Sequence, residues 1–276
     1  MGHTTFSFTI RDQVFFAQQW QPESPSRAVV AIIHGHGEHS GRYQQVAAYL
    51  NQAGMAVVSY DLYGHGQTAG KRGVVPSYAA LLESVDVFLE KVRSTWDIPL
   101  FLMGHSMGGN IAATYATQRQ ASLRGVILSA PWIKLAFEPS PVEVMLARIV
   151  GWIMPAYTRA TRLDATAISR DADEVVRYQT DPLIHDQMGA VLLMGCVRAA
   201  ENLVSGVAVW PPQLPVLIMH GSRDRLTSFE ASRQFAARVG VAATWQPWEG
   251  LYHEMHHEPE RFQVLDTLIA WIVTHI

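Results

Sequence analysis

The stretch Pro99-Leu-Phe-Leu-Met-Gly-His-Ser-Met-Gly-Gly-Asn-Ile-Ala-Ala-Thr-Tyr-Ala116 decides the fold of this chain. An apolar run at 100–103 leads into a G-x-S-x-G turn centred on Ser106, and a pattern typical of a helix follows at once. A serine on so sharp a strand-to-helix turn takes a strained backbone conformation. Gly104 and Gly108 remove the side chains that would collide across the turn. The sequence therefore predicts an exposed hydroxyl at a helix N-terminus, where free N–H groups favour developing negative charge.

Length, composition and charge narrow the class of protein. The chain has 276 residues, of which 49% are hydrophobic and 16% charged, which allows one large domain with an insertion. A net charge of −3 without a long basic run argues against nucleic acid as the main partner. The single cysteine, Cys196, cannot form an intramolecular disulfide and fits a reducing compartment. Because neither a signal-peptide pattern nor a bilayer-spanning apolar stretch is evident, we expect a cytoplasmic protein.

Strand and helix patterns alternate on both sides of the opening stretch. Two β-prone runs at 4–10 and 14–20 predict an antiparallel hairpin. A helix is predicted after Ser106, and the other expected elements are strands at 28–33, 55–60, 100–103, 125–129, 216–221 and 244–248 and helices at 43–52, 77–96, 229–239 and 261–274. This order predicts an α/β fold with a mostly parallel sheet and helices on both faces.

The alternation stops between Pro131 and Pro212, where the pattern is helical and interrupted by further prolines. We expect residues 132–209 to form a helical cap, inserted into a core made of residues 1–131 and 210–276. Within the cap, the stretch 142–155 is apolar around most of a helix. Two interpretations of this stretch stay open. It packs against the core as an ordinary cap helix, or it provides an acyl-chain channel or a patch for membrane or micelle contact.

A nucleophilic serine needs a base, and the base needs an acid that orients it. Catalytic residues of such sheets gather beyond the carboxyl ends of the strands, and the order serine, acid, histidine is typical of this turn. Asp224 follows the strand at 216–221, whereas Asp61 precedes the serine, and His253 follows the last strand. The sequence therefore predicts that Ser106, Asp224 and His253 catalyse acyl transfer through a covalent intermediate, without a cofactor.

The tetrahedral oxyanion of acyl transfer needs two N–H donors. We expect one from the backbone of Met107 and the other from the loop after the strand at 28–33, at His36. His34, His36 and His39 also form a cluster of metal-binding residue types, and the segment 253–257 spells H-E-x-x-H, a zinc pattern. Because the serine framework explains both segments, and because the second is expected to be a loop rather than a helix, we expect no metal.

Four segments of the chain resemble the monoacylglycerol lipases and the related lysophospholipases, which are serine hydrolases with the α/β-hydrolase fold. They are His34-Gly-His-Gly-Glu-His-Ser-Gly-Arg-Tyr43, Tyr60-Asp-Leu-Tyr-Gly-His-Gly66 through Gly73, Gly104-His-Ser-Met-Gly-Gly109, and His220-Gly-Ser-Arg-Asp224 with His253. The likeness spans most of the core and is only loose in the cap. The resemblance implies an α/β-hydrolase fold with an inserted cap, and a lipid ester as substrate, either a monoacylglycerol or a lysophospholipid.

The resemblance also implies a site for the leaving alcohol, because Glu38, Arg42 and His256 align with family positions near that alcohol. From the residues alone, Glu38 and Arg42 are equally well explained as an ion pair that fixes their loop, and His256 as a surface histidine. The same fold also serves short-chain carboxylesterases, thioesterases and peptidases. A non-enzymatic binding protein on this fold would be expected to lack part of the catalytic group, which is complete in this sequence.

Overall fold

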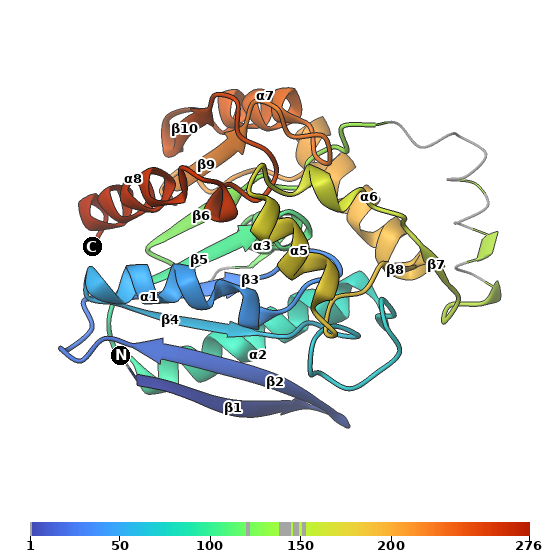
Figure 1. Cartoon of the computed structure of the whole chain (residues 1–276), viewed down its shortest axis with the longest axis horizontal. Coiled ribbons are helices and arrows are strands. Elements are labelled where there is room, and N and C mark those ends of the chain that lie inside the picture. Colours follow the sequence, from blue (N-terminus) through green and yellow to red (C-terminus); the bar gives the residue numbers. More distant parts are fainter. Residues whose placement is uncertain (1, 120–121, 138–144, 146–148, 151–152) are drawn as a thin grey trace.

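The computed structural model describes residues 2–119, 122–137, 145, 149–150 and 153–276. Its centre is an eight-stranded sheet in the order β1-β2-β4-β3-β5-β6-β9-β10 (Figure 1). The strands are β1 (Gly2–Ile10), β2 (Gln13–Gln21), β3 (Ala28–Ile33), β4 (Met55–Tyr60), β5 (Leu100–His105), β6 (Gly125–Ser129), β9 (Val216–Gly221) and β10 (Ala243–Trp248). β1 pairs antiparallel with β2, and β2 with β4, whereas the other pairs are parallel. The predicted α/β fold with a mostly parallel sheet is confirmed.

The central strands are buried on both faces because helices cover both sides of the sheet. These helices are α1 (Gln44–Gln52), α2 (Tyr78–Thr95), α3 (Met107–Gln118), α7 (Phe229–Val239) and α8 (Arg261–Thr274). In β3, Val29 and Ile33 pack into the core with α2, α3 and α7, whereas Val30 and Ile32 pack with α1 and α8. Successive side chains of a strand point to opposite faces, so a strand that is apolar at every position needs two covering layers.

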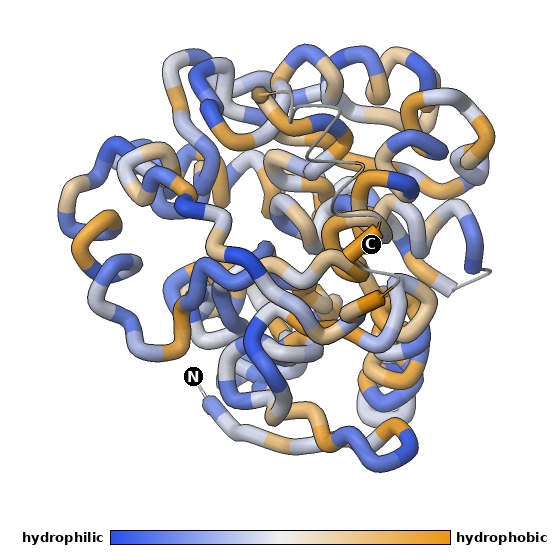
Figure 2. Tube along the Cα trace, turned by 90° about the vertical axis from the view of Figure 1, so that its right-hand side faces the viewer, coloured by the Kyte–Doolittle hydropathy of each residue, from blue (hydrophilic) through white to orange (hydrophobic). Residues whose placement is uncertain are grey.

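The helices begin where the sequence provides capping residues. The Ser77 hydroxyl accepts the N–H of Ala80 at 3.0 Å at the start of α2, and Ser228 caps α7 in the same way. Along the tube in Figure 2, hydrophobic and hydrophilic residues alternate within the helices, as expected when one helix face lies on a sheet. The helices predicted at 43–52, 77–96, 229–239 and 261–274 are confirmed to within a residue at each end.

Between β6 and β9 the chain leaves the sheet and forms several elements at the end toward which the parallel strands point (Figure 1). They include β7 (Thr158–Ala160), α5 (Ala172–Thr180), β8 (Gln187–Gly189) and α6 (Ala190–Ser205). β7 and β8 form an antiparallel pair, so the insertion contains two short strands besides its helices, which the helical pattern of the sequence did not indicate. Strands of three residues are too short to show the alternation that predicts a strand, and they depend on tertiary pairing.

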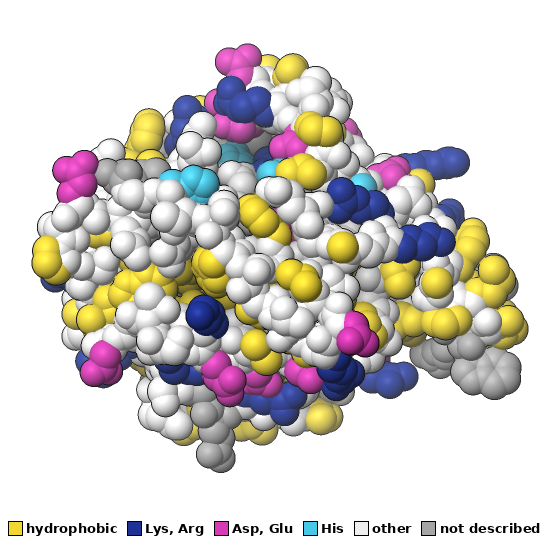
Figure 3. All heavy atoms as spheres, turned by 90° about the horizontal axis from the view of Figure 1, so that it is seen from below, with side chains coloured by type: hydrophobic (Ala, Val, Ile, Leu, Met, Phe, Trp, Pro, Cys, Tyr) yellow, Lys and Arg dark blue, Asp and Glu magenta, His cyan; other side chains and the backbone are white. Residues whose placement is uncertain are grey.

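Most of the apolar stretch 142–155 lies outside the described residues. Met145, Ile149, Ile153 and Met154 are exposed, with values from 46% for Ile149 to 63% for Ile153, whereas Val150 is partly buried. In Figure 3, hydrophobic side chains gather on the end of the molecule that projects to the right. Packing against the core therefore does not account for these side chains. Within the described ranges, no helix combines the length and the apolar character that crossing a bilayer requires.

Candidate active site

Ser106 stands between β5 and α3 in a conformation that few residues adopt. Its φ is 53° and its ψ is −116°, a strained region that costs about 1–3 kcal/mol for a non-glycine residue. Two glycines make the turn possible. A Cβ on Gly104 would lie 2.2 Å from the carbonyl oxygen of Gly108, and a Cβ on Gly108 would lie 2.0 Å from that of Ile33. The helix α3 therefore lies closer to β3 and β5 than any side chain would allow.

Backbone hydrogen bonds hold Ser106 in this conformation. Its N–H donates to the carbonyl oxygen of Ser129 at 3.0 Å, and its own carbonyl accepts the N–H groups of Asn110 at 3.1 Å and Trp132 at 2.9 Å. The hydroxyl makes no capping hydrogen bond to α3. The surrounding strand and helix thus stabilise the strained turn and leave the Oγ free of a capping role.

Asp224 and His253 follow the last two strands of the sheet and meet at its carboxyl edge. Nδ1 of His253 lies 2.6 Å from Oδ2 of Asp224. The other carboxylate oxygen of Asp224 accepts the N–H groups of Leu226 at 2.7 Å and Thr227 at 3.0 Å. Both side chains are buried. The pair is a charge-assisted hydrogen bond inside the protein, and backbone donors orient its carboxylate.

The imidazole of His253 lies beside the turn that carries Ser106. Its ring centroid is 4.7 Å from that of His105, the residue before the serine. The loop after β3 approaches the same turn, since a Cβ on Gly35 would lie 3.3 Å from the Cβ of Ser106. Residues that follow β3, β5, β9 and β10 therefore converge at one edge of the sheet, as expected for an open α/β sheet.

The charges around His253 set its affinity for a proton. Burial disfavours the imidazolium, but the carboxylate of Asp224, with smaller contributions from Glu254 and Glu38, outweighs burial and raises the pKa of His253. Burial also disfavours the charged form of Asp224. His253 and His220 outweigh that effect and hold the pKa of Asp224 well below its ordinary range. Asp224 is therefore ionised at neutral pH, where it stabilises a positive charge on His253.

A buried ion pair holds the loop between β3 and α1. Oε1 of Glu38 accepts the N–H of Gly35 at 2.6 Å and the hydroxyl of Tyr43 at 2.9 Å, and its Oε2 accepts from Arg42 at 3.0 Å. Arg42 also donates to both carboxylate oxygens of Glu254, in the loop after β10, at 2.6 and 2.7 Å. The ion pair considered for Glu38 and Arg42 is therefore present, and it joins the two loops that flank the serine turn.

His36 lies in the loop after β3, and Met107 directly follows Ser106 at the start of α3. Met107 is the first residue of α3, where a backbone N–H has no partner within the helix. The ring nitrogens of His36 are buried without a hydrogen-bond partner, and its side chain lines a cavity of about 320 Å³ together with Tyr178 and His185 from the cap. Burial, with a smaller effect of His185, lowers the pKa of His36 to about 3. Its imidazole is therefore neutral at physiological pH.

His256 is buried, so the interpretation of this residue as a surface histidine is wrong. Its side chain stacks on Tyr43 with ring centroids 5.3 Å apart and meets the ring of His105 edge-on at 5.0 Å. Neither of its ring nitrogens has a hydrogen-bond partner. Burial, together with the neighbouring His257 and His105, holds the pKa of His256 well below its usual value. The sequence did not show this burial because the contacts come from distant segments.

Of the histidines considered as metal ligands, His36 has no hydrogen-bond partner, whereas others bond to protein groups. These pairs are His34 with the N–H of Leu62, His39 with Asp181, and His257 with Glu254. The H-E-x-x-H segment contains the short 3₁₀ turn η4 (Met255–His257) rather than an α-helix, so its two histidines do not share one helical face. In the part of the chain that the structure describes, no group of three or more ligand residues is arranged to hold a metal ion.

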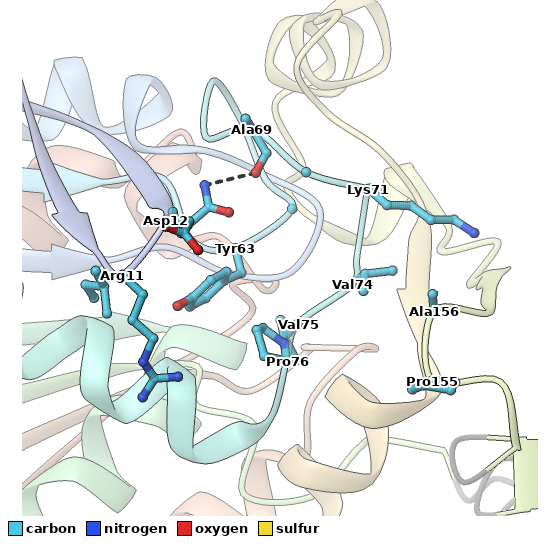
Figure 4. A pocket seen from close by; sticks show the side chains of 14 residues that line it. Arg11, Asp12, Tyr63, Ala69, Lys71, Val74, Val75, Pro76, Pro155 and Ala156 are labelled. Atoms are coloured by element: carbon cyan, nitrogen blue, oxygen red, sulfur yellow. Dashed lines mark hydrogen bonds between the residues drawn. The ribbon is translucent and has the colours of Figure 1, made fainter.

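A larger cavity, of about 600 Å³, is lined by none of the predicted site residues (Figure 4). Its walls come from Arg11 and Asp12 in the β1–β2 turn, from Tyr63 in the loop after β4, and from Pro155 and Ala156 in the insertion. The candidate site is therefore defined by the arrangement of its reactive side chains and not by the size of a cavity.

Two side chains that contact Asp224 were missed by the sequence reasoning. Nε2 of His220 lies 3.0 Å from Oδ2 of Asp224, and the hydroxyl of Thr227 donates to the same oxygen at 2.8 Å. The only signal in the sequence is that His220 stands four residues before Asp224 at the end of a strand. The turn after β9 brings the two side chains together, and its path is not evident from the residue types.

Comparisons with known proteins cover most of the chain. Residues 24–260 match the family model described as serine aminopeptidase, S33. The chain is 34% identical over 268 residues to a monoacylglycerol lipase of Mycolicibacterium smegmatis, covering 93% of this chain and 92% of that protein. It is 30% identical over 261 residues to phospholipase YtpA of Bacillus subtilis, covering 93% and 99%. An abhydrolase domain-containing protein of Dictyostelium discoideum is 33% identical over 262 residues, which are 93% of this chain but 27% of that longer protein.

A solved structure of a monoacylglycerol lipase also matches this chain over most of its length. The crystal structure of a monoacylglycerol lipase from Paleococcus ferrophilus matches with a TM-score of 0.87 and 31% identity, covering 95% of this chain and 99% of that one. A match of this extent includes the insertion between β6 and β9 as well as the sheet and its helices. Together with the strained serine turn at the carboxyl edge of the sheet, these matches show that the chain belongs to the monoacylglycerol lipase family, carboxylic ester hydrolases with the α/β-hydrolase fold.

Proposed function

We propose that this enzyme hydrolyses monoacylglycerols to a fatty acid and glycerol, with Ser106 as nucleophile, His253 as general base and Asp224 as the acid that orients the base. The convergence of the strained serine turn with the buried Asp224–His253 pair carries this proposal. The similarity to the enzyme of Mycolicibacterium smegmatis, which is named a monoacylglycerol lipase, supports the choice of substrate.

In the acylation step, Nε2 of His253 takes the proton of the Ser106 hydroxyl while Oγ attacks the ester carbonyl carbon. The carbonyl oxygen becomes an oxyanion, and the bond from the carbon to the alcohol oxygen then breaks. His253 returns the proton to that oxygen, so glycerol leaves as a neutral alcohol. Water then donates a proton to His253 and attacks the acyl-enzyme. Collapse of the second intermediate releases the fatty acid and restores the proton to Ser106.

The backbone N–H groups of His36 and Met107 bind the oxyanion in this proposal. Donors of this kind are worth about 3 kcal/mol each where they have been measured. The hydrogen bond from the Gly35 N–H to Glu38 supports this role, because it fixes the loop one residue before the His36 N–H. A donor held in place before the reaction stabilises the oxyanion without a reorganisation cost.

Glu38, Arg42 and His256 contribute to the site for the leaving alcohol in different ways. Glu38 and Arg42 are bonded to each other and to neighbouring loops, so they shape this side of the site through the backbone that they hold. His256 has two ring nitrogens without partners. It is therefore the member of this group that can bond an alcohol hydroxyl without losing an existing hydrogen bond.

The cap, which we place at residues 132–209, determines contact with lipid. Among the described residues between 137 and 157, the exposed large hydrophobic side chains are Phe137, Met145, Ile149, Ile153, Met154 and Tyr157. A concentration of exposed apolar side chains on one segment favours binding to a lipid aggregate. The enzyme then works as a peripheral protein that draws its substrate from a membrane or micelle, from the cytoplasmic side. The buried single cysteine Cys196 fits that reducing compartment.

Labelling with a fluorophosphonate tests the nucleophile directly. The probe is expected to label the wild-type chain and not Ser106→Ala, and the loss of Ser106 should lower kcat by several orders of magnitude. Ser84→Ala is the control, because Ser84 is a buried serine of α2 that bonds Leu81 and Tyr60. Labelling of Ser106→Ala at the wild-type rate would overturn the assignment.

A panel of esters tests the substrate class. We expect kcat/KM to rise from butyryl to dodecanoyl glycerol, since each buried methylene contributes up to about 0.8 kcal/mol. Lysophosphatidylcholines belong in the same panel, because the relative YtpA is named a phospholipase. A steady fall with chain length would favour a short-chain carboxylesterase, and faster cleavage of an aminoacyl amide would favour a peptidase.

A further inference from the structure

Asp224 is shared by two histidines. Nδ1 of His253 lies 2.6 Å from Oδ2 of Asp224, and Nε2 of His220 lies 3.0 Å from the same oxygen. The side chains of His220 and Asp224 are fully buried. The hydroxyl of Thr227 donates to this oxygen as well, at 2.8 Å. One carboxylate oxygen therefore divides its negative charge among three donors.

The contacts of His220 determine which of its nitrogens carries a proton. Nε2 faces Oδ2 of Asp224 and, at 3.3 Å, the carbonyl oxygen of Thr227. Both oxygens are acceptors only, so Nε2 must be the protonated nitrogen. Nδ1 lies 2.9 Å from the hydroxyl of Ser232 in α7, which can donate to it. The ring of Phe229, also from α7, lies at 85° to the imidazole, with ring centroids 5.9 Å apart.

We propose that His220 is a positioning residue for hydrolysis, whose Nε2–H holds Oδ2 of Asp224 in place and limits the negative charge that Asp224 offers to His253. The proposal rests on the roles of Ser106, His253 and Asp224 given above. His220 touches neither the substrate nor the reacting atoms in this proposal. It acts through Asp224, and Ser232 acts through His220 by keeping the ring in the orientation that donates.

The physical basis is the competition of donors for one anionic oxygen. When the His220 N–H is lost, more of the charge of Asp224 is available to His253, and the imidazolium of His253 becomes more stable. The pKa of His253 then rises further, and Asp224 is held by fewer bonds. The other groups that face His253 are Glu254, Glu38 and His105. They stay unchanged in a His220 variant, so that a change in the pH profile reports on His220.

The pH dependence of kcat/KM for a p-nitrophenyl ester tests the proposal in the full-length enzyme. For His220→Leu we expect the acid midpoint to move up by roughly half a pH unit, and kcat to fall roughly tenfold with little change in KM. For His220→Gln we expect most of both effects to be restored, since the amide N–H can donate to Asp224. The Ser84→Ala variant is the control and should keep the wild-type midpoint.

Two results would overturn the proposal. One is a wild-type acid midpoint in His220→Leu at a normal melting temperature. The other is that His220→Gln has the same acid midpoint and the same kcat as His220→Leu. If the leucine variant does not fold, Ser232→Ala takes its place. It is expected to move the midpoint in the same direction by a smaller amount, and an unchanged midpoint there would also overturn the proposal.

The same samples separate this inference from the proposed function. If fluorophosphonate does not label Ser106 in the wild-type enzyme, the proposed function fails. If Ser106 is labelled normally and the His220→Leu profile equals the wild-type profile, only the role of His220 fails.

Discussion

At Ser106, the surrounding backbone compensates for the conformational cost of a positive φ. Hydrogen bonds to Ser129 and from Trp132 fix the peptide groups on both sides of the residue. The glycines at 104 and 108 allow the close approach of helix and strand that those bonds require. Relaxing the turn would break these contacts together, so the strain persists in the folded protein.

The raised pKa of His253 sets the acid side of the pH profile. In the proposed mechanism His253 must be neutral to accept the Ser106 proton, so we expect kcat/KM to fall as the pH drops through this pKa. Because the carboxylate of Asp224 outweighs burial, we expect the midpoint to lie above the ordinary histidine value of about 6.5. Measuring kcat/KM for a soluble ester across the neutral range checks this expectation.

Asp224→Asn is the matched variant for this measurement. It removes the carboxylate while keeping a side chain of the same shape, so the midpoint should move to lower pH. The rate should also fall by about 10,000-fold, as found when the acid of such a group is replaced elsewhere. A variant midpoint at or above the wild-type value would show that Asp224 does not stabilise the imidazolium.

Among the elements, the strands present the reactive side chains and the insertion presents the apolar ones. Ser106, Asp224 and His253 each follow a strand of the parallel part of the sheet, where strand direction brings the chain to one edge. The insertion between β6 and β9 has a different character, because most of its described hydrophobic side chains from 145 to 157 are exposed. In the proposed function, chemistry and lipid contact thus belong to different elements.

Binding to phosphatidylcholine vesicles tests the contribution of the insertion. The double variant Ile153→Asp, Met154→Asp should bind at least roughly tenfold more weakly, since burying one large apolar side chain contributes about 1.5–3 kcal/mol. Val241→Asp is the control, because Val241 is fully exposed in the 3₁₀ turn η3 (Gly240–Ala242) outside the insertion. Equal sedimentation of the two variants with vesicles would contradict the lipid contact, and their kcat on a soluble short ester should be the same.

In the whole molecule, hydrogen bonds connect the segment 168–171 of the insertion to the loop that carries His253. The N–H of Glu254 donates to the carbonyl oxygen of Ile168 at 2.7 Å, and the hydroxyl of Ser169 donates to that of His257 at 2.9 Å. Arg170 donates to the buried carboxylate of Glu258 at 2.9 Å. This part of the insertion therefore helps to support the loop that carries His253.

Arg170→Ala should destabilise the protein by about 2 kcal/mol and lower kcat, because it removes the charged partner of the buried Glu258 carboxylate. Urea denaturation and the kcat for a soluble ester measure the two effects. Arg225→Ala is the control, since Arg225 pairs with Asp164 of the insertion but both side chains are about half exposed. It should change the free energy of unfolding by no more than about 0.5 kcal/mol. Equal effects of the two variants would contradict this role of Arg170.

The sequence by itself determined the elements of the core and their order. Apolar runs such as 28–33 and 216–221 predicted strands buried on both faces, and Ser77 marked the start of α2, because these signals depend on residues close together in the chain. The G-x-S-x-G turn and the order of Asp224 and His253 after it followed from strand order, since parallel strands end at a common edge. The roles of these residues in catalysis stay a prediction that the labelling experiment tests.

Only the tertiary structure decided which distant side chains meet. It placed Tyr43 against His256, which buries a residue that resembles a surface histidine in the sequence. It paired β7 with β8 across the insertion, and it brought His220 and His253 onto one oxygen of Asp224. These contacts depend on how the elements pack and on the path that each turn takes. Neither can be read from the pattern of residue types along the chain.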